Sequence, residues 1–543
     1  MNDVVTISND IITQPVAHLG IVAGILKKIG LANKVDQLLP KTSNNYTVSH
    51  GNAVAAMILN GLGFVERRLY MVSTFFKDLP VAELIDPHIT ADMLNDDVLG
   101  RTLDAIHEYG VTKLYSNIAF EIGNENGLFN KFAHLDSTTI SVSGKYSGQE
   151  EEAAQVTFGH SKDHRPDLKQ LTLSLTMTGK SSFPLWMESL SGNSSDKDSF
   201  HNTIDTIRKF QEEINRSQPF IWVADAALYS ANKLLKKGNS IYWISRVPET
   251  INEAKRYLQK NDKSYQWNKI DDNYHYTLLK SNYGEVAQRW LLVKSEDAYA
   301  REILTFESNI DLKFNALADK IKKINKTIYE TKKIAEHECK DLIKKNPLFN
   351  ITYNIAEEYK KSGLEKELIG FKVEIKFTKN YVNIQKERNM KGRFIIATNY
   401  HDLKFLPDHA MLSEYKKQSQ VEKGFRFIKD KSFLVSDMYL KKNTSLESLM
   451  LIMCFSLMVY NLAEFWLRKS LRESNATVPN QIGKQISNPT LKWIFQMMRN
   501  ICYVQLSING VFQKVITNFN DTHRKILELF GGEILKIYGI PSA

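Results

Sequence analysis

The sequence has 543 residues, of which 43% are hydrophobic and 24% charged, a composition typical of a soluble globular protein. This length exceeds what one hydrophobic core normally serves, so we expect two to four domains. The 71 Lys and Arg against 61 Asp and Glu give a net charge of +10, which favours a polyanionic partner but is spread thinly. The three cysteines stand far apart in no metal-ligand spacing, which argues against a disulfide framework and a structural zinc site.

No segment is typical of export or of a membrane span. The first 14 residues carry acidic and polar side chains, so we expect no signal peptide. The best membrane candidate, 446–467, is interrupted by Glu447, Asn461 and Glu464, and its unbroken apolar part is too short to cross a bilayer. We therefore expect a buried helix there, no membrane partner and a reducing, cytoplasmic location.

Residues 1–130 form the first predicted domain, which is mostly helical. Apolar residues recur at helical spacing, and Gly and Pro separate the segments. The expected helices are 19–39, 49–61, 64–76, 92–110 and 112–124. The domain either binds DNA or serves as an accessory or dimerisation bundle, because no recognition helix is evident.

From residue 131 the pattern changes to strands, and 131–248 is the second predicted domain. The expected strands are 132–142, 168–178, 183–190, 220–228 and 240–247, with helices at 200–214 and 230–237. This order of elements predicts an α/β protein with an RNase H-like core. Its mixed five-stranded sheet would place the first strand beside the fourth.

Two aspartates occupy these two neighbouring strands. Asp136 lies in the middle of the first strand and Asp225 near the end of the fourth, so both carboxylates can point to one site. An acidic residue in such a position is also commonly a turn former or a helix cap. Residues that favour strands continue past Asp136, which argues against a turn, and Asp225 ends a buried strand, where sheet ligands usually bind.

A polar loop, 158–170, leads into the second strand. It either contacts DNA backbone through Lys162, His164 and Arg165 or is a solvated turn set by the Pro that follows Arg165. The loop has no helical face on which an i, i+4 pair of histidines would meet a third ligand, so a zinc site is not indicated.

An insertion domain, 249–400, interrupts the core. It begins with strand-like runs at 274–279 and 286–293, passes into a charged helical tract at 298–345, and ends with strands at 371–377 and 392–398. The lysine-rich tract either follows phosphates or faces water.

The next predicted domain, 401–435, contains a helix with one polar, cationic face that surrounds a carboxylate. An apolar stripe of Val421, Phe425 and Ile428 lies beside that face. The residues that share the polar face are Tyr415, Gln418, Glu422, Arg426 and Lys429. A solvated surface helix with ion pairs is the alternative. The last predicted region, 436–543, reads as helices at 446–471, 489–506 and 511–529.

The spacing of Tyr415, Gln418, Glu422 and Lys429 resembles the Y-(2)-R-(3)-E-(6)-K signature of DDE transposases from bacterial insertion sequences. Gln418 departs from the signature, which has Arg there, and a neutral amide can contact DNA only without charge. Segments 65–70 and 96–104 also look like the N-terminal domain of one insertion-sequence subgroup.

This resemblance implies a chemistry. Asp136, Asp225 and Glu422 would be both the catalytic residues and the ligands of two Mg²⁺ ions, with Mn²⁺ as a substitute. The enzyme would nick double-stranded DNA at the terminal inverted repeats of an insertion element and transfer the free 3′-hydroxyl into target DNA, as cut-and-paste transposition. Tyr415, Gln418, Arg426 and Lys429 would contact that DNA.

The resemblance also implies a homodimer in the synaptic complex, and an insertion-domain aromatic, Trp267 or Trp290, as a platform for a flipped base. Either tryptophan is equally explained as a core or edge-strand residue. Two alternatives to the transposase remain. One is an RNase H-like nuclease without strand transfer, and the other is an inactive, DNA-binding transposase remnant.

Overall fold

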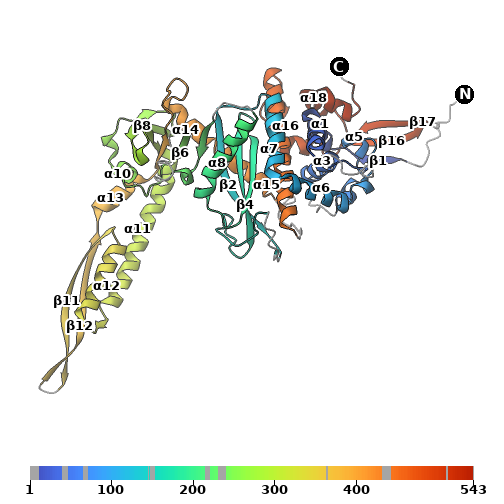
Figure 1. Cartoon of the computed structure of the whole chain (residues 1–543). Coiled ribbons are helices and arrows are strands. Elements are labelled where there is room, and N and C mark those ends of the chain that lie inside the picture. Colours follow the sequence, from blue (N-terminus) through green and yellow to red (C-terminus); the bar gives the residue numbers. More distant parts are fainter. Residues whose placement is uncertain are drawn as a thin grey trace. The chain divides into compact units, whose positions relative to one another are not determined.

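The protein folds as two compact units in the computed structural model (Figure 1). The first unit combines Met1–Leu228 with Lys416–Ala543, and the second is Tyr229–Tyr415. The structure describes residues 11–39, 47–64, 71–144, 146, 153–214, 220–229, 240–362, 365–430, 442–508 and 511–541. The predicted helix 230–237, the segment 65–70 and the end of the predicted 401–435 domain lie outside these described residues.

A mixed sheet forms the centre of the first unit, with strand order β4-β3-β2-β5. Strands β2 (Phe132–Val142), β3 (Lys169–Thr178) and β4 (Phe183–Ser191) form an antiparallel meander. After helix α8 (Asp196–Glu213), β5 (Ile221–Ala224) returns parallel to β2. The predicted pairing of the first strand with the fourth is therefore present. These strands are buried nearly throughout, because helices cover them.

The N-terminal part of this unit is helical, as predicted. Its helices are α1 (Leu19–Ile29), α2 (Leu31–Leu38), α3 (His50–Leu62), α4 (Val72–Phe76), α5 (Val81–Leu84), α6 (Asp96–Tyr109) and α7 (Val111–Glu125). The single helix expected at 19–39 is two helices, because Gly30 takes a left-handed conformation (φ 64°) that ends α1 and begins α2. Ser49 and Asn95 cap α3 and α6 through their side-chain oxygens.

Helix α16 (Asn443–Glu473) joins the helical part to the sheet. It packs against β4 and against α1, α3, α6 and α7, and α7 also packs against β4 (Figure 1). By length and composition α16 could cross a membrane, but its most apolar stretch is 89% buried inside the protein. It is thus the buried helix expected at 446–467.

The C-terminal region differs from its prediction. Only parts of the helices expected at 489–506 and 511–529 are helical, namely α17 (Leu491–Met497) and α18 (Asp521–Phe530). A hairpin of β16 (Cys502–Ile508) and β17 (Val511–Thr517) lies between them, and α19 (Gly532–Ile537) follows α18. The physical reason is a third strand, β1 (Ile12–Pro15), which pairs with β16 across almost the whole chain. Alternating apolar and polar residues with an Asn-Gly pair between the two runs is a hairpin signal.

The second unit contains five strands in the order β6-β13-β9-β8-β7. Its strands are β6 (Tyr242–Arg246), β7 (Asn268–Lys269), β8 (Tyr274–Ser281), β9 (Gln288–Ser295) and β13 (Arg393–Thr398). Helices α10 (Asn252–Gln259), α13 (Tyr381–Met390) and α14 (Asp408–Lys416) accompany it. The fifth strand expected for the core, β6, thus belongs to this unit, where it pairs with β13.

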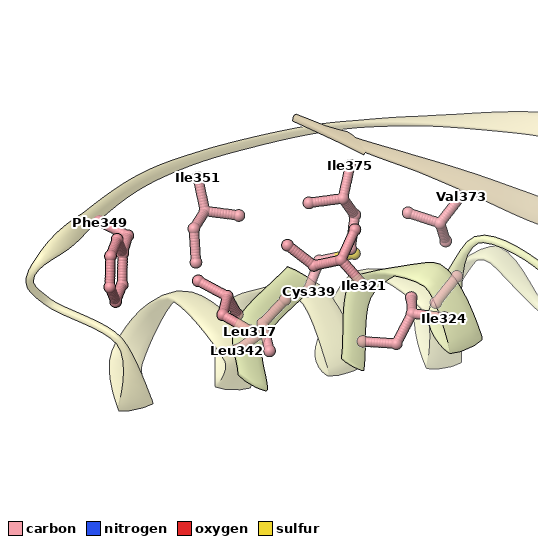
Figure 2. Close-up of a cluster of buried hydrophobic side chains, with 10 residues drawn as sticks. Leu317, Ile321, Ile324, Cys339, Leu342, Phe349, Ile351, Val373 and Ile375 are labelled. Carbon is pink, nitrogen blue, oxygen red and sulfur yellow. The ribbon is translucent and has the colours of Figure 1, made fainter. Parts of the chain in front are cut away.

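The helical tract expected at 298–345 is interrupted. It forms α11 (Glu296–Ile324), the short strand β10 (Ile328–Tyr329) and α12 (Lys332–Lys345). A long hairpin of β11 (Phe349–Ser362) and β12 (Glu365–Lys379) follows, although only 371–377 was expected to be extended. Figure 2 shows that apolar side chains of both helices and both strands form one core, with Leu317, Cys339, Phe349 and Val373 among them.

Candidate active site

The segment with the transposase-like spacing is not one helix. Helix α14 ends at Lys416, and α15 begins at Ser419 and ends at Ile428. Gln418, Glu422 and Lys429 belong to the first unit, whereas Tyr415 is the last residue of the second. The apolar stripe is confirmed, because Val421, Phe425 and Ile428 are buried.

The two aspartates come from neighbouring strands of the sheet. In the parallel pairing of β2 with β5, the last paired residues are His134 and Val223. Asp136 lies two residues after His134, and Asp225 lies two residues after Val223, directly after the end of β5. Residues two positions apart share a face of a strand, so Asp136 lies on the same face of β2 as His134.

Backbone N–H groups hold both aspartates. The N–H of Ser137 donates to Asp136 Oδ1 at 2.8 Å, and the N–H of Ala227 donates to Asp225 Oδ1 at 2.8 Å. Asp225 thereby caps the short 3₁₀ helix that follows it (Ala226–Leu228). Capping and a functional role are compatible, because a carboxylate has two oxygens and several acceptor positions.

Helix α15 packs directly on strands β2 and β3 of this sheet. The Gln418 side chain is buried, and its Nε2 donates to the backbone oxygen of Leu135 at 2.7 Å, one residue before Asp136. Glu422 follows one turn later on the same side of the helix and is exposed. Gln418 therefore joins the start of the Glu422 helix to the strand that carries Asp136.

Gly424 permits this close packing. A Cβ at this position would lie 2.3 Å from Met177 Cε of β3 and 3.2 Å from Leu457 Cδ2 of α16. Any larger residue would have to displace one of these neighbours.

The neighbourhood of Asp136 also contains a buried imidazole. His134 lies on the same face, two residues earlier, and is 4% exposed. Burial lowers the pKa of this imidazole to about 4, the Gln418 amide raises it in part, and Lys417 lowers it further. His134 is therefore neutral at pH 7.

The polar loop after β2 folds back over the same strand. Lys162 Nζ donates to the backbone oxygen and Oγ of Ser137, at 2.8 and 2.9 Å. Lys429 pairs with both carboxylate oxygens of Asp163, at 2.7 and 2.9 Å. The loop thus connects the strand of Asp136 to the end of α15. Arg165 pairs with Asp167, as the turn interpretation of this loop expects.

The donor set suits a hard metal ion, since Mg²⁺ prefers carboxylate oxygens. Within the described residues, however, no group of three or more His, Cys, Asp or Glu side chains is close enough together to hold a metal ion. The pairing of β2 with β5 places Asp136 and Asp225 on or directly after neighbouring strands, and α15, which carries Glu422, packs on β2 and β3, without a three-carboxylate cluster among the described residues.

The remaining predicted site residues have different surroundings. Arg426 is exposed on α15, and Tyr415 is half-buried. Trp290 is fully buried in β9, where its Nε1 donates to Gln288 Oε1 at 2.8 Å, so it is a core residue. Trp267 is half-buried, and the Arg393 guanidinium lies 5.7 Å from its ring centroid.

Sequence reasoning missed two structural links at this site, those of Gln418 to Leu135 and of Lys162 to Ser137. Both are side-chain contacts to backbone oxygens, which have no residue pattern of their own. The departure of Gln418 from the signature Arg was the one available signal for the first of them.

A family model described as "Transposase DDE domain" matches residues 129–462, and a "Domain of unknown function (DUF4277)" matches residues 11–120. No curated protein matches the chain. A chain from a cryo-EM structure of the piggyBac transposase synaptic complex with hairpin DNA is similar, with a TM-score of 0.38 and 8% identity, covering 89% of this chain and 80% of that one.

The transposase model covers more than half of the 543 residues. Its matched region includes Asp136 on β2, Asp225 directly after β5, and Glu422 on helix α15, which packs on β2 and β3. The chain therefore belongs to the DDE-type transposases.

Proposed function

We propose that this protein catalyses cut-and-paste transposition of an insertion element by metal-dependent phosphodiester hydrolysis and strand transfer. The observation that carries the proposal is the parallel pairing of β2, which contains Asp136, with β5, which ends directly before Asp225, together with the packing of the Glu422 helix α15 on β2. The pairing of the first strand with the fourth supports an RNase H-like core for this reaction. A cytoplasmic, DNA-bound homodimer would be the working form.

Three carboxylates have the chemistry that a pair of Mg²⁺ ions requires. Asp136, Asp225 and Glu422 would hold the ions. When bound, the ions would supply charge neutralisation at the attacking and leaving oxygens of the phosphodiester. The backbone N–H groups that bond Asp136 and Asp225 orient the two carboxylates, and Glu422 is exposed, so its rotamer can adapt.

The DNA would lie along the exposed part of α15. Arg426 and Lys429 would contact its phosphates and position the strand without reading its sequence. Tyr415 would contribute from the adjoining helix α14. Lys429 is paired with Asp163, so a phosphate would have to compete with that carboxylate for its ammonium group. Gln418 would contact DNA only if it left its bond to Leu135.

Strand cleavage with Mg²⁺ on a DNA fragment that carries the native element ends tests this proposal. The parent protein is compared with Asp136→Asn, Asp225→Asn and Glu422→Gln, and DNA affinity is measured for all four. We expect each substitution to lower the cleavage rate by at least a hundredfold with unchanged DNA affinity, because each removes a charge that neutralises the transition state. The matched control is Asp167→Asn, because Asp167 is an exposed loop carboxylate paired with Arg165. We expect this variant to cleave DNA at the parent rate.

Other outcomes identify the alternatives. Cleavage without joining of products to a target plasmid would indicate a nuclease of the same fold. A parent protein that binds DNA but never cuts would indicate an inactive remnant. If Glu422→Gln cuts as fast as the parent, helix α15 does not contribute to catalysis.

A further inference from the structure

A polar cavity lies beside α15, on a different face of the helix from Glu422. Its volume is about 650 Å³, and its walls come from the turn between β3 and β4, from α15 and from α16. Residues from the three elements include Lys180, Ser181, Lys423, Phe427 and Arg472. Lys423 and Phe427 are one and five residues after Glu422, which corresponds to rotations of roughly 100° and 140° around the helix. The cavity is thus separate from the carboxylate site.

The charge of the cavity is strongly positive. Lys180, Lys423, Arg468 and Arg472 line it, against a single acid, Glu464. Arg468 is held by Glu464 at 2.8 Å and by the backbone oxygen of Pro489 at 2.9 Å. The other three cations are exposed, and none of them forms an ion pair with any residue that the structure describes. Three cations from three elements therefore line one space, and no acidic residue that the structure describes forms an ion pair with them.

A second observation points to a ligand. Ser181 is 7% exposed, and its Oγ has no hydrogen-bond partner among the described residues. A buried hydroxyl without a partner is costly, and such groups in native proteins commonly mark a missing water, ion or ligand. Ser181 lines the same cavity as the three cations, so one bound anion would satisfy all four groups.

We infer that this cavity binds the phosphate backbone of one DNA strand, through Lys180, Lys423 and Arg472 with Ser181 Oγ as a neutral hydrogen-bond donor. Its volume is in the range of sites for small organic groups, which suits a nucleotide unit but not a duplex. Phe427 and Tyr460 in the wall offer aromatic surface to a neighbouring sugar or base. The inference rests on the proposed function, since it assigns the same DNA a second contact.

Salt-dependent DNA binding by the full-length protein, measured without metal, tests the inference. The Lys423→Gln/Arg472→Gln variant is compared with the parent and with Lys469→Gln/Lys484→Gln, which removes the same charge at two exposed lysines outside the cavity. We expect the slope of log affinity against log salt to fall by roughly 0.7–0.9 for each cavity cation removed, and to change little in the control. Ser181→Ala should weaken binding roughly two- to fivefold with an unchanged slope.

Equal slopes for the cavity and control variants would overturn the inference, because the lost affinity would then reflect net charge alone. A thermal-shift titration gives a second test. The inference would be overturned if inorganic pyrophosphate raised the melting temperature of the parent more than that of the cavity variant while DNA raised both equally. The site would then bind small phosphate compounds and not DNA. Failure of the proposed function would give a different result, in which the parent protein binds DNA normally but does not cleave it.

Discussion

Gln418 occupies the signature position that holds Arg in the transposase-like motif, and its contacts here are inside the protein. The transposase-like signature has a cationic residue at this position, suited to DNA. Here an amide is buried against β2 and donates to the backbone oxygen of Leu135. A guanidinium would carry a charge into this buried place beside the neutral imidazole of His134, at a large desolvation cost. The structure therefore favours positioning of α15 over a DNA contact as the role of Gln418.

The substitution Gln418→Leu separates these two roles. Leucine fills similar space but leaves the Leu135 oxygen without its partner, which we expect to cost roughly 1–3 kcal/mol of stability. We expect cleavage to slow by roughly tenfold to a hundredfold because α15 loses its link to the strand of Asp136. DNA affinity and its salt dependence should stay at the parent values.

The result that would refute positioning is a weaker DNA affinity with a normal cleavage rate at saturating DNA. The variant Gln418→Asn keeps an uncharged amide donor at this buried position, so partial recovery of the cleavage rate would support the hydrogen bond as the cause. Thermal denaturation of both variants shows whether a loss of activity is only a loss of folded protein.

At the scale of the elements, close backbone approaches position the helices of the first unit. The clearest is between α2 and α3, where a Cβ added at Gly51 would lie 2.0 Å from the backbone oxygen of Ala32. The N–H of Gly51 also donates to Asp36 Oδ1 at 2.7 Å. Backbone atoms cannot turn aside as a flexible side chain can, so no local adjustment relieves this contact.

Gly51→Ala should therefore destabilise the protein by roughly 1–3 kcal/mol through overpacking. Gly100→Ala is the matched control, because Gly100 lies inside α6 and nothing is within 4 Å of its added Cβ. That control should stabilise the protein by up to about 1 kcal/mol through helix propensity. Chemical denaturation of both variants measures the difference, and two equal changes would show that the α2–α3 contact relaxes.

The elements that the sequence predicted well are those with a strong local pattern. The expected bounds of β2, 132–142, match the observed strand, and the helices of the N-terminal part and the pairing of β2 with β5 are also present. The C-terminal hairpin was missed because its apolar residues also suit a helix, and its partner β1 is nearly 500 residues away in the chain. Long-range pairing of this kind has no local signal.

The features of the candidate site also differ in how well the sequence predicts them. The pairing of the strand of Asp136 with the strand that precedes Asp225 could be predicted from strand order alone, and Glu422 could be placed on a helix from the apolar stripe beside it. The break before Ser419 could not be foreseen, because both sides of it favour a helix, and it coincides with the boundary between the two compact units. Contacts such as Lys429 with Asp163 depend on how a loop folds back, which no spacing encodes.

At the scale of the whole molecule, the two ends of the chain build one body within the first unit. Strand β1 pairs with β16, and Tyr538 donates its hydroxyl to the backbone oxygen of Ala17 at 2.5 Å. Added Cβ atoms at Gly20 and Gly24 would meet Tyr538 and Ile534, so α1 and α19 fit closely. The N-terminal and C-terminal segments therefore stabilise each other, and a change at their junction should affect the folding of this unit.

His18 lies at that junction and makes it sensitive to pH. Its ring stacks on Phe495 of α17 with centroids 4.4 Å apart, and its Nε2 lies 2.8 Å from the backbone oxygen of Leu62 at the end of α3. Burial lowers the pKa of His18 to about 4, although the bond to Leu62 raises it in part. Because this value is below the usual 6.5, the unfolded chain takes up the proton first as the pH falls.

The stabilisation linked to neutral His18 is therefore complete above about pH 6.5, decreases as the pH falls, and is lost below about pH 4. The difference between the two pKa values corresponds to roughly 3 kcal/mol at most, and roughly 2 kcal/mol of it should be lost by pH 5. His18→Gln keeps a side-chain donor for Leu62 but cannot be protonated. Chemical denaturation at pH 7.5 and pH 5 should show a smaller loss of unfolding free energy for His18→Gln than for the parent, by about that amount.

Burial also lowers the pKa of His134, but this effect is the same in both proteins and cancels in the comparison. Equal losses would mean that His18 is protonated without cost, and that groups outside this junction set the acid stability of the protein.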